Sequence, residues 1–151
     1  MDKKSFEMLY GDLPYASLPE RLRQLLPEDK QDVQRARMLV ELGYPTVAAA
    51  IPHLMIWLQD GNWPVAQIIA PFLASIGKPS IPEIKKILHG NDDIWKYWIL
   101  TLVVMELNAA DVKELEPELK LLAQTESLEE LDVIAKECLV QNSKQLEPIA
   151  P

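Results

Sequence analysis

Apolar positions recur along the chain at helical spacing, and glycine and proline mark where each run ends. In "IIAPFLASI" (68–76), apolar residues lie at positions i, i+1, i+4, i+5 and i+8, which form one face of an α-helix. Glycine followed closely by proline punctuates such runs at "GYP" (43–45), "GNWP" (61–64) and "GKP" (77–79). Glycine readily ends a helix, and proline is tolerated in a first helical turn. The pattern predicts short helices joined by tight turns, without strands.

These predicted helices repeat. The segments "IPHLMIWL" (51–58), "IPEIKKIL" (81–88) and "EPELKLLA" (116–123) each place a proline ahead of matching apolar positions. A period of about 30–35 residues that contains two helices is typical of solenoids, in which neighbouring pairs bury each other's apolar faces. The order of helices and turns resembles HEAT repeats. The predicted fold class is therefore all-α, a HEAT-like α-solenoid of about three antiparallel helix pairs with an N-terminal helical arm and a C-terminal capping helix.

The same pattern divides the chain into three regions. Residues 1–26 form the N-terminal arm, whose short helix is predicted to open with a capping box at "SLPE" (17–20). Residues 27–142 hold the repeats, and residues 143–151 are predicted to be a frayed tail. The first helices of the pairs are expected over 30–42, 63–76 and 93–107, the second helices over 52–60, 80–89 and 110–124, and the capping helix over 127–141.

The repeat register assigns the tryptophans. Trp57 coincides with Ile87 of the next repeat and is predicted to lie in the core. Trp63 is expected to cover the turn between two helices, with a binding role as the alternative. The helix after residue 93 is apolar on nearly all sides, which indicates a helix buried between neighbours, so Trp95 and Trp98 are also assigned to the core.

The register also predicts which positions of the second helices face outward, where partners of solenoids commonly dock. The candidate partner-binding face consists of His53, Met55, Ile56, Glu83, Lys85, Lys86, Glu118 and Lys120. Met55 and Ile56 are apolar where solvent is expected. Either the arm folds over them with the leucines of residues 17–26, or they form an exposed docking patch.

A longer stretch carries a more specific signal than the repeat pattern. The run "LQDGNWPVAQIIAPFLASIGKPSIPEIKKIL" followed by "NDDIWKYWIL" resembles a bacterial family catalogued as domain of unknown function 5071, over roughly residues 26 to 141. The resemblance implies a small HEAT-like helical protein. It supplies no catalytic residues and no cofactor.

Groups that could perform chemistry are isolated in the sequence. His53 and His89 each stand alone, and the single cysteine, Cys138, lies on an apolar helix face, where it is expected to be a small buried residue. The "NDD" at 91–93 is expected to cap a helix, and Asp60 to form a turn. No phosphate-binding loop or nucleophile motif occurs. The prediction is a protein without enzymatic activity, metal or cofactor.

Charge and composition limit the partners. The net charge is −8, and residues 91–151 hold 13 acidic and 5 basic side chains, a balance that repels nucleic acid. No apolar run is long enough to span a bilayer, so a membrane partner is not expected. One cysteine and the absence of a signal-peptide pattern at the start favour a cytoplasmic location.

Two functional hypotheses follow. The first is a non-catalytic protein-interaction module, monomeric or weakly self-associating, with an immunity-type protein that neutralises a basic toxin as its concrete form. The second is an enzyme or enzyme accessory, for example a HEAT protein resembling DNA glycosylases. The acidic charge disfavours this alternative, since such enzymes need a basic surface for phosphates.

Overall fold

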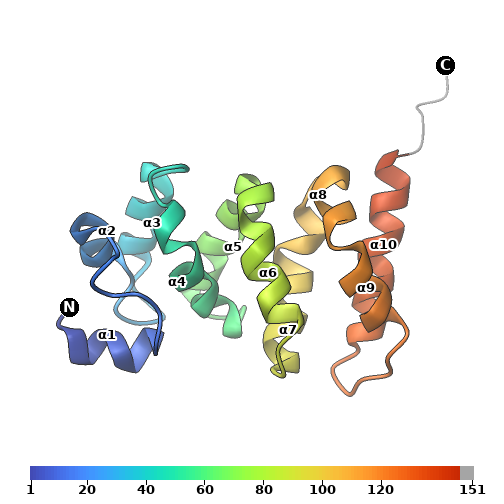
Figure 1. The fold of residues 1–151 in the computed structure, drawn as a ribbon, viewed down its shortest axis with the longest axis horizontal. Helices are drawn as coiled ribbons and strands as arrows, with labels where there is room; N and C mark the ends of the chain where they lie inside the picture. Colours follow the sequence, from blue (N-terminus) through green and yellow to red (C-terminus); the bar gives the residue numbers. More distant parts are fainter. Residues whose placement is uncertain (147–151) are drawn as a thin grey trace. The chain divides into compact units, whose positions relative to one another are not determined.

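The computed structural model describes residues 1–146, with side chains up to Asn142, and all regular structure in that range is helical (Figure 1). The α-helices within those bounds are α1 (Lys3–Tyr10), α2 (Glu20–Leu25), α3 (Val33–Leu42), α4 (Ile51–Met55), α5 (Pro64–Ile76), α6 (Ile81–Leu88), α7 (Asp93–Leu102), α8 (Ala109–Glu114), α9 (Glu116–Ala123) and α10 (Leu131–Leu146). Short 3-10 helices are η1 (Ala48–Ala50), η2 (Ile56–Gln59), η3 (Lys78–Ser80) and η4 (Val104–Glu106). The predicted all-α class is confirmed.

The chain divides into two compact units, an N-terminal unit of residues 1–72 and a C-terminal unit of residues 73–151. The division falls inside α5.

Side-chain caps explain where several helices begin. The carboxylate of Asp92 accepts a hydrogen bond from the backbone N–H of Trp95 at 3.0 Å, which confirms the capping role predicted for "NDD". Asp2 and Asn108 cap α1 and α8 in the same manner. Asp60 accepts from the N–H of Asn62 at 2.9 Å and so holds the turn expected there.

The N-terminal arm contains two helices instead of the one predicted. The additional helix is α1, whose buried residues Phe6 and Tyr10 lie four positions apart and therefore on one face. The predicted capping box is wrong, because α2 starts after Pro19 and no side chain caps it.

The second helices of the first two pairs follow the predicted register. A 3-10 turn leads into α4 at Ile51 and another leads into α6 at Ile81, and each helix has proline in its first turn. Buried positions then coincide at a shift of 30: Leu54 with Ile84, Trp57 with Ile87, and Leu58 with Leu88.

The C-terminal unit departs from the predicted boundaries in several places. The helix expected over 93–107 ends at Leu102 and continues as η4, and the helix expected over 110–124 is divided at Leu115. The last helix is α10, which extends to Leu146. Residues 143–146, predicted as tail, are thus helical, and residues 147–151 lie outside the described range.

One face of α10 holds it in the C-terminal unit. Leu131, Ala135, Cys138 and Asn142 are buried at spacings of four, three and four residues, which lie on one side of a helix. The helix packs against α7, α8 and α9, and Figure 1 shows it alongside α9. The opposite side of α10 is therefore left to solvent.

Candidate functional site

In the N-terminal unit, the arm closes over α4 and η2 through one tyrosine. The Tyr10 hydroxyl donates to the carbonyl oxygen of Pro27 at 2.6 Å and accepts from the indole N–H of Trp57 at 3.0 Å. The Tyr10 and Trp57 rings meet edge to face, with centroids 6.0 Å apart. Burial raises the pKa of Tyr10 well above its usual value, although the hydrogen bond from Trp57 opposes the shift. Trp57 is buried, as predicted.

His53 lies beneath the same closure. The side chain has 0% exposure, and its Nε2 is 2.8 Å from the carbonyl oxygen of Pro14. A carbonyl only accepts hydrogen bonds, so Nε2 bears the proton in this contact. The rings of Phe6 and Tyr10 lie 5.6 and 5.7 Å from the imidazole. The prediction that His53 faces outward is therefore wrong, because the arm supplies a cover that the repeat register did not include.

The apolar pair on α4 and η2 does not form an open patch. Met55 is buried at 1% exposure, so an open docking patch at this residue is wrong. Ile56 is half-buried. The arm contacts this segment at His53 and Trp57, and cover of Met55 by the leucines of residues 17–26 stays a prediction.

The rest of the predicted partner-binding face lies on α6 and α9: Glu83, Lys85, Lys86, Glu118 and Lys120. Most of these charges are paired within the protein. Lys86 contacts Glu83 at 2.9 Å, and Lys120 contacts Glu116 at 2.6 Å. The Nε2 of His89 lies 3.3 Å from a carboxylate oxygen of Glu118. Lys86 and Lys120 are exposed, whereas Glu83, Lys85 and Glu118 are partly covered.

A surface that was not predicted lies on the outer side of α10. Val133 and Val140 are 44% and 53% exposed, and Leu128, in the loop before the helix, is 100% exposed. Glu130 and Glu137 are exposed between them. We define Leu128, Glu130, Val133, Glu137 and Val140 as the α10 stripe. Positions 133, 137 and 140 follow the spacing of one helix face.

Five exposed glutamates of the C-terminal unit have no ion-pair partner among the side chains that the structure describes. Glu106, Glu126, Glu129, Glu130 and Glu137 are exposed, and none forms an ion pair with another side chain up to residue 142. The nearest lysine on the helix, Lys136, instead lies 3.8 Å from Asp132. The stripe therefore combines apolar surface with negative charge that is free to meet an external cation.

Cys138 lies on the buried side of the same helix. Its sulfur is 3.9 Å from the carbonyl oxygen of Leu100, and burial raises the pKa of the thiol to about 12. A thiol with so high a pKa holds its proton near neutral pH and is a poor nucleophile. The prediction of a small buried residue is confirmed.

The other three tryptophans are all partly exposed. Trp95 and Trp98 are only half-buried, so their assignment to the core is wrong. Neighbouring helices cover only part of the first half of α7, where Ile94 is exposed. Trp63 is half-buried beside the turn, with its ring centroid 6.0 Å from that of Trp57.

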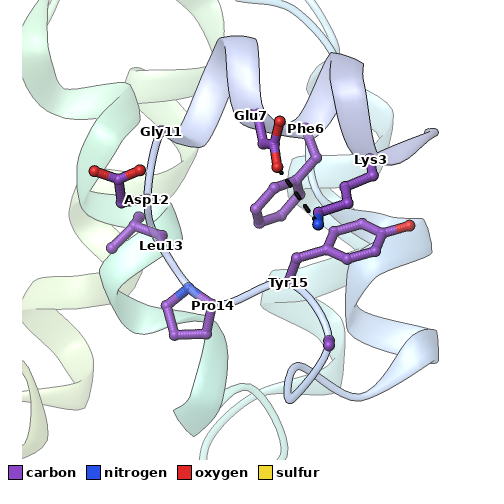
Figure 2. Close-up of a pocket in the computed structure, with 9 residues that line it drawn as sticks. Lys3, Phe6, Glu7, Gly11, Asp12, Leu13, Pro14 and Tyr15 are labelled. Carbon is purple, nitrogen blue, oxygen red and sulfur yellow. Dashed lines mark ion pairs between the residues drawn. The ribbon is translucent and has the colours of Figure 1, made fainter.

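A hollow of about 500 Å³ opens in the arm, between α1 and the loop that follows it. Figure 2 shows Phe6 pointing inward from α1 beside Tyr15 from the loop, and the two rings meet edge to face at 4.9 Å. Lys3 and Glu7 form an ion pair at its rim, with nitrogen and oxygen 3.7 Å apart. The hollow is built wholly from residues 3–16.

The part of the chain that the structure describes offers neither a metal site nor a membrane-spanning helix. No three His, Cys, Asp or Glu side chains there are grouped so that they could hold a metal ion. No helix there is long and apolar enough to cross a membrane.

The described residues form an all-helical protein in which the buried positions of α4 and α6 coincide at a shift of 30 residues and the last helix exposes an acidic and apolar side. Residues 25–139 match the family described as a domain of unknown function, DUF5071, and the chain belongs to that family. No curated protein matches the chain. The helix α1 and its hollow precede the matched residues, whereas all of the α10 stripe except Val140 falls within them.

Proposed function

We propose that this protein is a non-catalytic protein-interaction module built on HEAT-like repeats, and that its C-terminal unit binds a basic protein partner. The observation that supports the proposal is the set of exposed glutamates in that unit that have no ion-pair partner among the described side chains. A partner can contact these carboxylates without first breaking a salt bridge in the protein. The exposed lysines on α6 and α9 differ, because each already has a carboxylate beside it.

The distribution of charge favours the same partner. The N-terminal unit contains nine acidic and seven basic residues, whereas the C-terminal unit contains fourteen and eight. A surface of one sign attracts the opposite charge and accelerates encounter with it, most strongly at low ionic strength. A protein rich in lysine and arginine is the macromolecule that fits this field.

An immunity-type role is the concrete form of the proposal. In such a pair, the acidic surface would bind a basic toxin and neutralise it, and the protein would act as a monomer in the cytoplasm. A toxin reading frame directly beside the gene would support this form of the proposal. Its absence would leave the interaction module with a different basic partner.

The test is capture of the partner from the native cell with the full chain as bait. The variant Glu126→Lys/Glu129→Lys/Glu130→Lys reverses the unpaired loop charges. The control Asp12→Lys/Glu20→Lys/Glu41→Lys makes the same change in charge at exposed positions of the N-terminal unit. We expect mass spectrometry to identify a basic protein that the wild type and the control retain and the loop variant loses. A captured protein retained equally by all three baits would contradict the proposal.

A further inference from the structure

The two exposed valines of the α10 stripe are regularly spaced along the helix. Val133 and Val140 are seven residues apart, so they lie two helical turns, or about 10.5 Å, apart along one side of α10. Glu137 lies on the same side between them, and Glu130 precedes Val133 by three residues. Val133, Glu137 and Val140 therefore form a single line on the helix, and the exposed Lys136, which lies 3.8 Å from Asp132, is beside it.

We infer that the α10 stripe is the docking line for a basic amphipathic helix of the partner. This inference rests on the proposed function and specifies the element that the partner contributes. Apolar residues at positions i, i+3 or i+4, and i+7 of such a helix repeat at the distance that separates Val133 from Val140. Lysine or arginine beside that apolar line meets Glu130 and Glu137, which have no ion-pair partner among the described side chains.

The rest of α10 is suited to present this line. Its opposite face is buried against α7, α8 and α9, which fixes the helix and leaves the stripe outward. Leu128, in the loop before the helix, adds a fully exposed apolar side chain three residues before Leu131. The Ser127 hydroxyl accepts from the N–H of Leu131 at 2.9 Å and ties that loop to the start of the helix.

A second copy of the chain is a poorer occupant than a basic helix. Two stripes placed face to face would bring glutamates against glutamates, and like charges in an interface are costly. A lysine-rich helix places cations at those positions instead. Charge therefore selects a partner of opposite sign over self-association.

The test uses a synthetic helical peptide of leucine and lysine, about five turns long, with its leucines on one face. One control peptide has the same composition in an order that scatters the leucines around the helix. A second control has glutamate in place of lysine. Binding to the full chain is measured by fluorescence anisotropy, with Val133→Gln/Val140→Gln and Glu137→Lys as variants and Glu41→Lys as the matched control in α3.

We expect the basic amphipathic peptide to bind at least about tenfold more tightly than either control peptide, a difference of about 1.4 kcal/mol. Val133→Gln/Val140→Gln should weaken binding about tenfold without any change in charge. Glu137→Lys should have an effect of similar size that shrinks as salt is added. Glu41→Lys should change affinity less than twofold. All these substitutions lie at exposed positions, so circular dichroism should show an unchanged fold.

Three results would overturn the inference. The first is binding that the valine variant leaves unchanged while Glu137→Lys abolishes it, which would leave the proposed function intact and remove the helix-docking line. The second is failure of the basic amphipathic peptide to bind; if the loop-charge variant also retains every captured protein, the proposed function fails as well. The third is wild-type dimerisation that Val133→Gln/Val140→Gln abolishes in sedimentation, which would make a second copy the occupant.

Discussion

The two units treat the same repeat position in opposite ways. In the N-terminal unit that position is His53, buried under the arm with its Nε2 against the Pro14 carbonyl. In the C-terminal unit it is Glu83 and Glu118, and these carboxylates pair with Lys86 and His89. These three side chains occupy matching positions in the sequence pattern of the second helices. Their environments differ because the arm covers His53, whereas Glu83 and Glu118 contact side chains at the surface. Covering a second-helix face is thus a property of the arm and not of the repeat.

The units also differ in how they satisfy their polar groups. The N-terminal unit joins its arm to the repeat by hydrogen bonds of Tyr10 and His53 to groups far away in the sequence. The C-terminal unit places its long-range polar contacts at the surface, where Lys78 pairs with Glu114 and His89 with Glu118. The first arrangement buries the polar groups that it joins, and the second leaves them largely exposed.

The strongest test of this comparison is removal of the arm. Deleting residues 1–26 removes five buried side chains: Phe6, Tyr10, Leu18, Leu22 and Leu26. Each is worth roughly 1.5–3 kcal/mol, so their sum approaches the whole stability of a typical domain, ~5–15 kcal/mol. We expect urea melts to show loss of cooperative unfolding in the N-terminal unit, with self-association visible by light scattering. Met8→Ser, at an exposed position of α1, is the control, and an unchanged melt for the truncated chain would show that the arm is not part of the core.

Trp57→Ala should have the next largest effect. Truncating a large buried aromatic costs about 3–5 kcal/mol, and here it also removes the hydrogen bond to Tyr10. Ile87→Ala at the equivalent position of α6 should cost about 2–5 kcal/mol, since Ile87 is buried without such a bond. Lys86→Ala, on the exposed side of α6, should stay within about 0.5 kcal/mol. Similar urea midpoints for Trp57→Ala and Lys86→Ala would contradict the register shared by the two units.

The glycines that end α3 and α5 offer a smaller and more specific comparison. Gly43 and Gly77 have φ of +68° and +72°, a region that other residues enter at a cost of about 1–3 kcal/mol. A Cβ on Gly43 would meet only Val40 O, at 3.9 Å, whereas a Cβ on Gly77 would lie 2.6 Å from a carboxylate oxygen of Asp111. Thermal melts should therefore show Gly77→Ala to be more destabilising than Gly43→Ala by about 1 kcal/mol or more. Equal losses of unfolding free energy in the two variants would mean that the Asp111 side chain moves away from the new Cβ at no cost.

The smallest expected effect is the response of Cys138 to alkali. Because its pKa is raised from 9.0 to about 12 in the folded protein, its contribution to stability is complete below pH 9 and is lost as the pH rises toward 12. At pH 10, one pH unit above the ordinary value, the loss is on the order of 1 kcal/mol. Under reducing conditions, the wild type should lose more unfolding free energy between pH 8 and pH 10 than Cys138→Ala does, and the difference between the two losses should equal that amount. An identical pH dependence in both proteins would place the thiol in contact with solvent.

Much of the local architecture could be predicted from the sequence. Glycine and proline positions predicted the helices that became α3, α5, α6 and α7, and the shift of 30 residues predicted the buried positions of α4 and α6. Those predictions succeed because helix ends and apolar faces depend on neighbours within a few residues. The predicted capping box failed because a suitable spacing of residues does not ensure that the hydrogen bonds form.

The candidate site was harder to predict for a physical reason. The α10 stripe lies on a helix with apolar residues on two sides, and the sequence does not state which side the rest of the unit will cover. The available signal was that Leu131, Ala135 and Cys138 form one helix face and Val133 and Val140 another. Packing against α7, α8 and α9 buried the first set and left the second exposed.

The sequence by itself thus determined the helical class, the shift of 30 residues between the buried positions of α4 and α6, and the acidic character of the C-terminal unit, because these depend on composition and on short-range spacing. Only the tertiary structure decided that Tyr10 reaches Trp57, 47 residues away, that His53 is buried and that α10 presents its valines to solvent. Each of these outcomes depends on which distant segment arrives to cover a given face. Burial is a property of the folded neighbourhood, and a single linear pattern does not specify it.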